Sequence, residues 1–209
     1  MPLDLWLAFA AATIALLLIP GPTVLLVLSY AVSKGRSVAV ATALGVALGD
    51  FIAMTASLLG LGALVLTSAA LFTALKWIGA AYLVWLGVKL LRSAPSGGLQ
   101  AQAATGDVTA RGVFLHAAVV TALNPKSIAF FIAFVPQFLR PDAALLPQFA
   151  ILVATFVGLA GLNALAYALL ADRLRASIAR PGVITGLTRT GGLALIGMGL
   201  ATALLRRPA

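Results

Sequence analysis

The sequence predicts an all-α membrane protein with about six transmembrane helices, and three observations support this prediction. Of its 209 residues, 62% are apolar and only 9% are charged, whereas soluble domains carry about 25% charged residues. The mean hydropathy is +1.12. The apolar residues gather in long runs, and each spanning helix needs roughly 20 of them to cross about 30 Å of hydrocarbon. We expect one transmembrane domain over residues 1–209 and no separate soluble domain.

The rest of the composition excludes several classes of site and partner. The formal net charge of +9 fits basic loops that face an anionic membrane leaflet, so we expect no nucleic-acid partner. The absence of cysteine excludes thiol redox chemistry and thiolate metal sites. With a single histidine, His116, we expect neither a metal nor a cofactor. The first apolar run carries Asp4 instead of a basic flank, which indicates a retained helix and not a cleaved signal peptide.

Three spanning helices are expected in the first half of the chain, about residues 3–91. The first apolar run covers about 3–32 and ends at Lys34-Gly35-Arg36. The second covers about 38–66, and a tight turn near Thr67-Ser68 leads to the third, about 71–91. A polar linker over about 92–111 separates the two halves and is predicted to be cytoplasmic.

The second half, about residues 112–205, repeats this plan. The fourth run covers about 112–139 and the fifth about 143–171. A basic linker over 172–189 is expected before a last helix that ends near Leu205.

Basic residues predict how the helices are oriented, because cytoplasmic loops are rich in Lys and Arg. Loops one, three and five hold nine basic residues, namely Lys34, Arg36, Lys89, Arg92, Arg111, Arg173, Arg175, Arg180 and Arg189. The opposite side holds three, namely Arg140, Arg206 and Arg207. We therefore expect loops one, three and five in the cytoplasm and both termini outside.

Three helices in each half give the halves opposite orientations, which predicts a 3+3 inverted repeat. Matching irregularities support the repeat. Prolines interrupt the first and fourth helices, at Pro20, Pro22 and Pro125. In the second and fifth helices a polar residue follows glycines, as in Gly45, Gly49 and Asp50, and in Gly158, Gly161 and Asn163.

The first break is the segment Pro20-Gly21-Pro22. Each proline lacks an N–H group, so the carbonyls of Leu16 and Leu18 lose their helical partners. Irregular backbone at membrane depth is tolerated where it is buried in protein or lines a wet cavity. The break therefore offers carbonyls to a cation and a half-helix N-terminus to an anion. The alternative is a structural kink.

The second break is Asn124-Pro125-Lys126. Pro125 frees the carbonyl of Thr121, and Asn124 can satisfy freed backbone groups or a ligand. Lys126 stands about midway along an apolar helix, where a charge costs about 2.5–3.5 kcal/mol on insertion scales. We expect it to face the interior, the alternative being that it snorkels to an interface.

Asp50 is the only carboxylate well inside an apolar run, and it adjoins a face of small residues formed by Ala41, Gly45 and Gly49. Three roles are open for it: a proton carrier, a counter-charge for a substrate ammonium, or a structural partner of Lys126. Asn163 either pairs with the opposite break or makes a helix–helix hydrogen bond.

In sequence order, these motifs resemble the LysE/RhtB amino-acid exporter family (lysine exporter and homoserine-threonine efflux type) along nearly the whole chain. The matching features are Pro20-Gly21-Pro22, Gly45-x-x-x-Gly49-Asp50, Lys76-x-x-Gly79-Ala80-Ala81-Tyr82-Leu83 with Gly87, Asn124-Pro125-Lys126, Phe130-Phe131 and Pro136-Gln137-Phe138. The chain departs from the family at Thr23, where Asn or Asp is frequent, and at Ser37 and Val38, where a glycine is frequent.

The resemblance implies a single transmembrane transporter domain in the bacterial inner membrane. It also implies that the protein exports amino acids by proton antiport and forms a homodimer. The expected cargo is a neutral amino acid resembling homoserine, threonine or leucine. Its carboxylate would meet Lys126 and backbone N–H groups, and its ammonium would meet Asp50 and the freed carbonyls. The expected substrate-binding residues are Pro20, Gly21, Pro22, Asp50, Asn124, Pro125, Lys126 and Asn163, with Asp50 coupling protons.

Three alternatives carry less support. Another small solute or a metal ion could be the cargo of the same scaffold, although a hard cation would need more carboxylates than Asp50 supplies. A membrane enzyme would need convergent nucleophile, base or metal groups, and the motifs contain none, so we expect no enzyme. A non-transporting assembly subunit would need partner features that the sequence lacks.

Overall fold

The computed structural model describes residues 1–19, 21–67, 69–92, 109–140, 143–178 and 181–204. This described part is all-α and contains no strand. Its helices are α1 (Leu3–Leu18), α2 (Pro22–Lys34), α3 (Ala39–Thr67), α4 (Ala69–Arg92), α5 (Ala110–Ala122), α6 (Pro125–Ala133), α7 (Leu145–Ile178) and α8 (Pro181–Leu204), with two short 3-10 helices at Gly35–Val38 and Val135–Phe138. The predicted all-α class is confirmed.

Proline and its neighbours set the helix starts that matter for the site. Pro22 is the first residue of α2 and Pro125 the first residue of α6, a position where the missing N–H costs no helical hydrogen bond. The axes of α1 and α2 differ by 59°, and those of α5 and α6 by 45°. Pro20, the third proline of the predicted breaks, lies outside the described residues.

Within the described residues, three helices are long and apolar enough to cross a membrane by themselves: α3, α4 and α7. The bent pairs α1 with α2 and α5 with α6 raise the number to five if each pair is one span. The sequence predicted six, and α8 is not among these five. The chain is thus a multi-pass membrane protein, with three to five spans by length and composition.

One predicted boundary is wrong. A basic linker was expected over 172–189, but α7 continues to Ile178 and α8 already begins at Pro181. Polar composition alone does not end a helix, because Arg, Leu and Ala all favour helix. The stop comes from Pro181, which cannot continue α7 but is well suited to begin α8.

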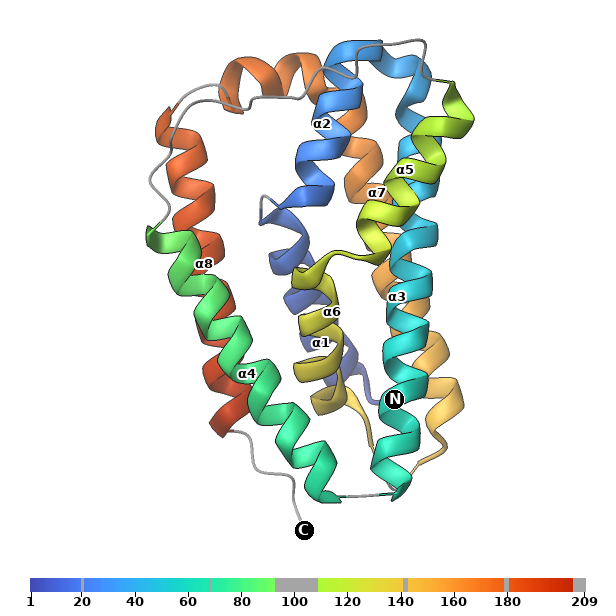
Figure 1. Cartoon of the computed structure of the whole chain (residues 1–209), viewed down its shortest axis with the longest axis vertical. Coiled ribbons are helices and arrows are strands. Elements are labelled where there is room, and N and C mark those ends of the chain that lie inside the picture. Colours follow the sequence, from blue (N-terminus) through green and yellow to red (C-terminus); the bar gives the residue numbers. More distant parts are fainter. Residues whose placement is uncertain (20, 68, 93–108, 141–142, 179–180, 205–209) are drawn as a thin grey trace.

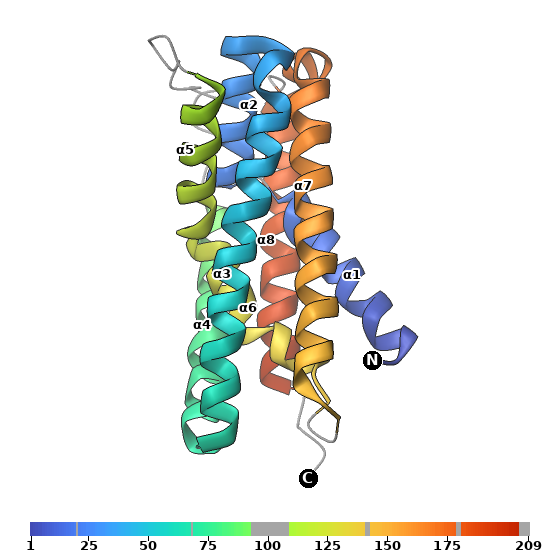
Figure 2. The same cartoon turned by 90° about the vertical axis from the view of Figure 1, so that its right-hand side faces the viewer.

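The helices form two packed edges with the broken segments between them. Figure 1 shows α4 and α8 side by side along one edge, α3, α5 and α7 along the other, and α1, α2 and α6 between the edges. Figure 2, turned by 90°, shows α1 leaning away from the long axis of the bundle beside α7. The bends of both broken pairs therefore come to lie inside the bundle.

Glycines allow the closest helix contacts. A Cβ atom on Gly49 would lie 2.5 Å from the Ala118 carbonyl oxygen, and one on Gly45 would overlap the Phe114 carbonyl oxygen. The small face predicted on α3 therefore packs against α5. In α8, Gly192 meets the backbone of α4 in the same way, so at least part of this thin helix packs within the chain.

Candidate functional site

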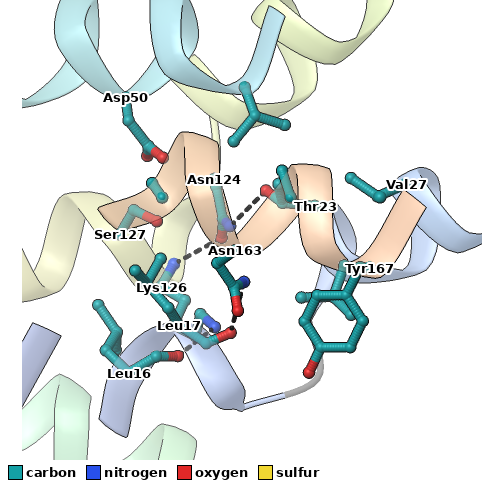
Figure 3. A pocket seen from close by; sticks show the side chains of 14 residues that line it. Leu16, Leu17, Thr23, Val27, Asp50, Asn124, Lys126, Ser127, Asn163 and Tyr167 are labelled. Atoms are coloured by element: carbon teal, nitrogen blue, oxygen red, sulfur yellow. Dashed lines mark hydrogen bonds between the residues drawn. The ribbon is translucent and has the colours of Figure 1, made fainter. Parts of the chain in front are cut away.

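A pocket lies where the two bent helix pairs meet (Figure 3). The space between its walls, with the open solvent at its mouth included, is about 410 Å³. Five helices line it with Leu16, Leu17, Thr23, Val24, Val27, Val46, Asp50, Asn124, Lys126, Ser127, Ala160, Asn163, Ala164 and Tyr167. Most of these side chains are apolar, and only Asp50 and Lys126 carry a charge.

Lys126 faces the interior of the protein and not an interface. Its side chain is 8% exposed, and Nζ donates hydrogen bonds to the carbonyl oxygens of Leu16 (3.1 Å) and Ile19 (2.9 Å). These carbonyls form the C-terminal end of α1, which carries partial negative charge. The ammonium of Lys126 therefore occupies a cation position at this break.

This contact concerns one of the two carbonyls that were expected to be free. The carbonyls of Leu16 and Leu18 were assigned to a substrate ammonium, and that of Leu16 accepts from Lys126, as does the carbonyl of Ile19. The carbonyl of Thr121, which was also expected to be free, accepts from the Asn124 N–H group at 3.1 Å. Within the described chain, both breaks are thus partly closed by the protein's own donors.

Asn124 joins the two breaks. Its Oδ1 atom caps α6 by accepting from the Lys126 N–H group at 3.1 Å, and its Nδ2 atom donates to Thr23 Oγ1 at 3.1 Å. Thr23 Oγ1 also lies 3.4 Å from Thr121 Oγ1. Thr23 and Thr121 were not among the predicted site residues, although Thr23 directly follows the second proline of its break.

Asp50 supplies the negative charge of the pocket. It lies on α3, is 3% exposed, and its Oδ1 atom has no hydrogen-bond partner. Figure 3 shows its carboxylate pointing from α3 into the pocket, on the side of Ser127 and Asn124. Of the contacts described for Lys126 Nζ, both go to backbone carbonyls and neither to this carboxylate.

The start of α2 differs from the start of α6. Gly21 is the N-cap residue of α2 and no side chain caps this helix, whereas Asn124 caps α6. The first turn of α2 lines the pocket through Thr23 and Val24. A Cβ atom on Gly21 would lie 3.4 Å from Lys126 Nζ, so this glycine lets the backbone pass close to the ammonium.

Asn163, on α7, contacts α1 close to its C-terminal end, and this contact fits both roles expected for it. Its Nδ2 atom donates to the Leu17 carbonyl oxygen at 3.4 Å. Together with Asp50, Asn124 and Lys126 it brings four predicted site residues into one pocket. Gly21, Pro22 and Pro125 form the adjoining helix starts, while Pro20 lies outside the described residues.

Phenylalanines of α1, α6 and α7 form a cluster in the core, and none of them is among the residues that line the pocket. Phe9, Phe130, Phe131 and Phe156 are all 0% exposed, and Phe134 and Phe138 extend the cluster. The rings of Phe131 and Phe156 meet edge to face at 4.7 Å between centroids. The pocket walls extend the other way, along α2 and α7 toward Val27 and Tyr167 (Figure 3).

His116 is not among the residues that line the pocket. It is exposed on α5, and its Nδ1 atom lies 2.7 Å from the hydroxyl of Tyr30 on α2. The two rings meet edge to face. This pair joins α2 to α5.

Comparisons with known proteins agree with this architecture. The family model described as LysE type translocator matches residues 14–206. The homoserine/homoserine lactone efflux protein of Salmonella typhimurium is 35% identical over 206 residues, which cover 97% of this chain and 98% of that protein. An uncharacterized membrane protein of Vibrio cholerae is 33% identical, with the same coverage.

A shorter match involves the leucine efflux protein of Salmonella choleraesuis, which is 34% identical over 142 residues, or 68% of this chain and 66% of that protein. No solved structure matches the chain significantly.

Proposed function

The chain belongs to the LysE type translocator family, and on this premise we propose that it exports neutral amino acids across the bacterial inner membrane by proton antiport. The names of its relatives support this cargo class, because they specify homoserine, homoserine lactone and leucine. The pocket is consistent with such a cargo, since it combines apolar walls with two opposite charges.

One observation carries the proposal: a buried carboxylate lines the pocket, and one of its oxygens has no hydrogen bond within the described part of the chain. The Oδ1 atom of Asp50 has no hydrogen bond, and a buried charge is costly unless it is paired. A substrate ammonium or a proton would each relieve this cost. Alternating occupancy of Asp50 by these two cations couples efflux of the amine to entry of a proton.

The surrounding residues complete the proposed binding site. Asn124 and Asn163 supply amide groups at the two breaks, and the helix starts at Gly21, Pro22 and Pro125 shape the backbone beside the pocket. Pro20 is included in the proposed site by its place in the sequence. Lys126 holds the end of α1 in place through its carbonyl contacts. The walls along Val27 and Tyr167 lead toward the cytoplasmic end, on the orientation expected from the basic loops.

The proposed transport cycle uses a 3+3 inverted repeat within a single transmembrane transporter domain, with repeats at about 3–91 and 112–205. The packing of α3 on α7 and of α4 on α8 supports it, because a two-fold repeat of three helices would bring such equivalent helices together. In this scheme α8 is the sixth span, each bent pair is one broken span, and two copies form a homodimer. Rocking of the halves alternates access to the pocket.

Transport in proteoliposomes tests the proposal. Purified chain is reconstituted with internal L-leucine, L-homoserine or L-threonine, and efflux is followed with and without an imposed inward proton gradient. We expect the gradient to accelerate efflux of at least one of them, and Asp50→Asn to abolish this acceleration. Asp4→Asn is the matched control, because Asp4 is exposed in the first turn of α1. Full proton-driven efflux by Asp50→Asn would refute the coupling.

A further inference from the structure

Three helices that line the pocket continue beyond it toward the end of the bundle where α3 ends and α7 begins (Figure 2). Helical residues three or four apart share one face. The residues that lie in line with Leu16, Ser127 and Ala160 of the pocket are Thr13 and then Phe9 on α1, Phe130 on α6 and Phe156 on α7. All four of these further residues are 0% exposed. The faces that line the pocket therefore lead into the phenylalanine cluster.

Phe130 stands at the centre of this cluster. Its ring centroid lies 6.5 Å from that of Phe9 and 6.0 Å from that of Phe156, within the usual spacing of packed aromatic pairs. These three rings come from α1, α6 and α7, so they bridge the two bent helix pairs and α7. A continuous apolar contact of this kind excludes water, and apolar constrictions close transport paths in membrane proteins.

Thr13 is a polar residue between the pocket and the rings. It lies three residues before Leu16 and four after Phe9, and these three are the buried residues of α1. Its Oγ1 atom has no hydrogen-bond partner among the described residues. A buried hydroxyl group without a partner costs free energy. Water or a polar cargo at this position would remove that cost, which indicates that the face of α1 beyond the pocket becomes wet in another conformation.

The rings lie on short segments that adjoin changes of backbone direction. Helix α6 carries Phe130 and spans only Pro125–Ala133. It begins at a bend of 45° from α5 and is followed by the 3-10 helix Val135–Phe138. Helix α1, which carries Phe9, meets α2 at 59°. Both segments can therefore turn about their ends without bending a long continuous helix.

We propose, resting on the proposed export function, that Phe9, Phe130 and Phe156 form the outer barrier of the transport path. Cargo leaves the pocket between α1, α6 and α7, passing Thr13, when these rings separate. In the conformation described by the structure the rings are together and the outer path is closed. The pocket walls at Val27 and Tyr167 lie toward the opposite end (Figure 3). The barrier thus prevents the pocket from being reached from both ends at once.

The absence of cysteine from the sequence allows a direct test on the full-length chain in membranes. Single cysteines are exposed to a membrane-impermeant maleimide on spheroplasts and on inverted membrane vesicles. Ala144→Cys, at an exposed position just before α7, identifies the preparation in which the outer end is accessible. From that side we expect Thr13→Cys to react at least about tenfold more slowly than Ala144→Cys, because the closed rings exclude water. Equal rates would overturn the barrier.

Loss of the central ring should open the path. Adding Phe130→Ala to Thr13→Cys should raise its labelling from the outer side by about tenfold or more. Leu83→Ala is the matched control, because it removes an equally buried side chain from α4, outside the proposed path. Phe130→Leu serves as a second variant if Phe130→Ala does not fold, with a smaller increase expected. No increase in either Phe130 variant, or an equal increase in Leu83→Ala, would overturn the inference.

Efflux of L-leucine from proteoliposomes gives a second readout. In Phe130→Ala, efflux without a gradient should rise, and the ratio of gradient-driven to passive efflux should fall toward one, because protons and cargo then cross independently. Leu83→Ala should keep the ratio of the unmodified chain. A proportional fall of both rates in Phe130→Ala would indicate lost packing alone and would contradict a barrier.

The two readouts separate failure of the barrier from failure of the proposed function. If the unmodified chain moves none of L-leucine, L-homoserine and L-threonine, export of these amino acids is refuted. Labelling of Thr13→Cys does not depend on any of these cargoes, so it still decides whether the rings close the outer end of the pocket.

Discussion

Alanine at Gly49 should destabilise the chain and impair transport, while the same change at Gly60 should do neither. Both glycines lie on α3, so the change in helix propensity is the same for the two substitutions. A Cβ atom on Gly49 would lie 2.5 Å from the Ala118 carbonyl oxygen and 2.7 Å from Thr121 Cβ. A Cβ atom on Gly60 would meet nothing within 4 Å.

These contacts set the size of the destabilisation expected for Gly49→Ala. Adding a methyl group to a closely packed interface costs about 1–3 kcal/mol, whereas replacing an exposed helical glycine with alanine gains up to about 1 kcal/mol. When the free energies of unfolding of the two variants are compared, the gain in helix propensity cancels and the packing cost remains. For a chain of this length, 1–3 kcal/mol corresponds to a difference of roughly 2–12 °C in Tm.

Transport should also be impaired in Gly49→Ala, because Gly49 directly precedes Asp50 and the new methyl group would push against Thr121 near the end of α5. Tm is measured on purified protein in detergent, and efflux of L-leucine or L-homoserine is measured in proteoliposomes for both variants. Equal Tm and equal efflux for Gly49→Ala and Gly60→Ala would refute the close α3–α5 packing on which the position of Asp50 depends.

Three further predictions test other contacts. Thr23→Val should lower the free energy of unfolding by about 1–3 kcal/mol, because Asn124 Nδ2 loses its acceptor. Thr23→Ser keeps a hydroxyl group and should stay close to wild type in chemical unfolding. An equal loss of stability in Thr23→Ser would contradict this account. Ala164→Leu should lower the apparent affinity for L-leucine in counterflow by about tenfold or more, and that for L-alanine by less, because the larger side chain fills part of the pocket. The exposed substitution Ala166→Leu is the control. Equal losses for both amino acids would argue against a size effect. Tyr30→Phe should cost only about 0.5–1.5 kcal/mol in the same unfolding measurement, since one partly exposed hydrogen bond is lost, and a larger loss would indicate that this pair does more than join α2 to α5.

Local chemistry explains why much of the site was predictable. A proline favours the first position of a helix, and an Asn before it favours the cap, so Asn124-Pro125 marked the start of α6 from sequence. A lone carboxylate and a lone ammonium within apolar runs must face the interior because of their cost in lipid, and Asp50 and Lys126 do so. These inferences depend only on neighbouring residues and on the solvent.

Other features depended on segments far apart in the chain. A hydropathy pattern could not show that α7 continues through its charged end to Ile178, because charge is compatible with helix outside the membrane. It could not show that the Thr23 hydroxyl accepts from Asn124, since these residues meet only when the two breaks are packed together.

By itself the sequence determined the all-α membrane class, the place of the second break and the buried charges, because each follows from local backbone chemistry or from the cost of polar groups in lipid. Only the tertiary structure decided which partners those charges have. Folding brings the ammonium of Lys126 to the carbonyls of Leu16 and Ile19 and leaves Asp50 Oδ1 without a partner. One of the two predicted substrate carbonyls, that of Leu16, thereby accepts from the protein itself, because side chain and carbonyl meet only through the contact between α6 and α1.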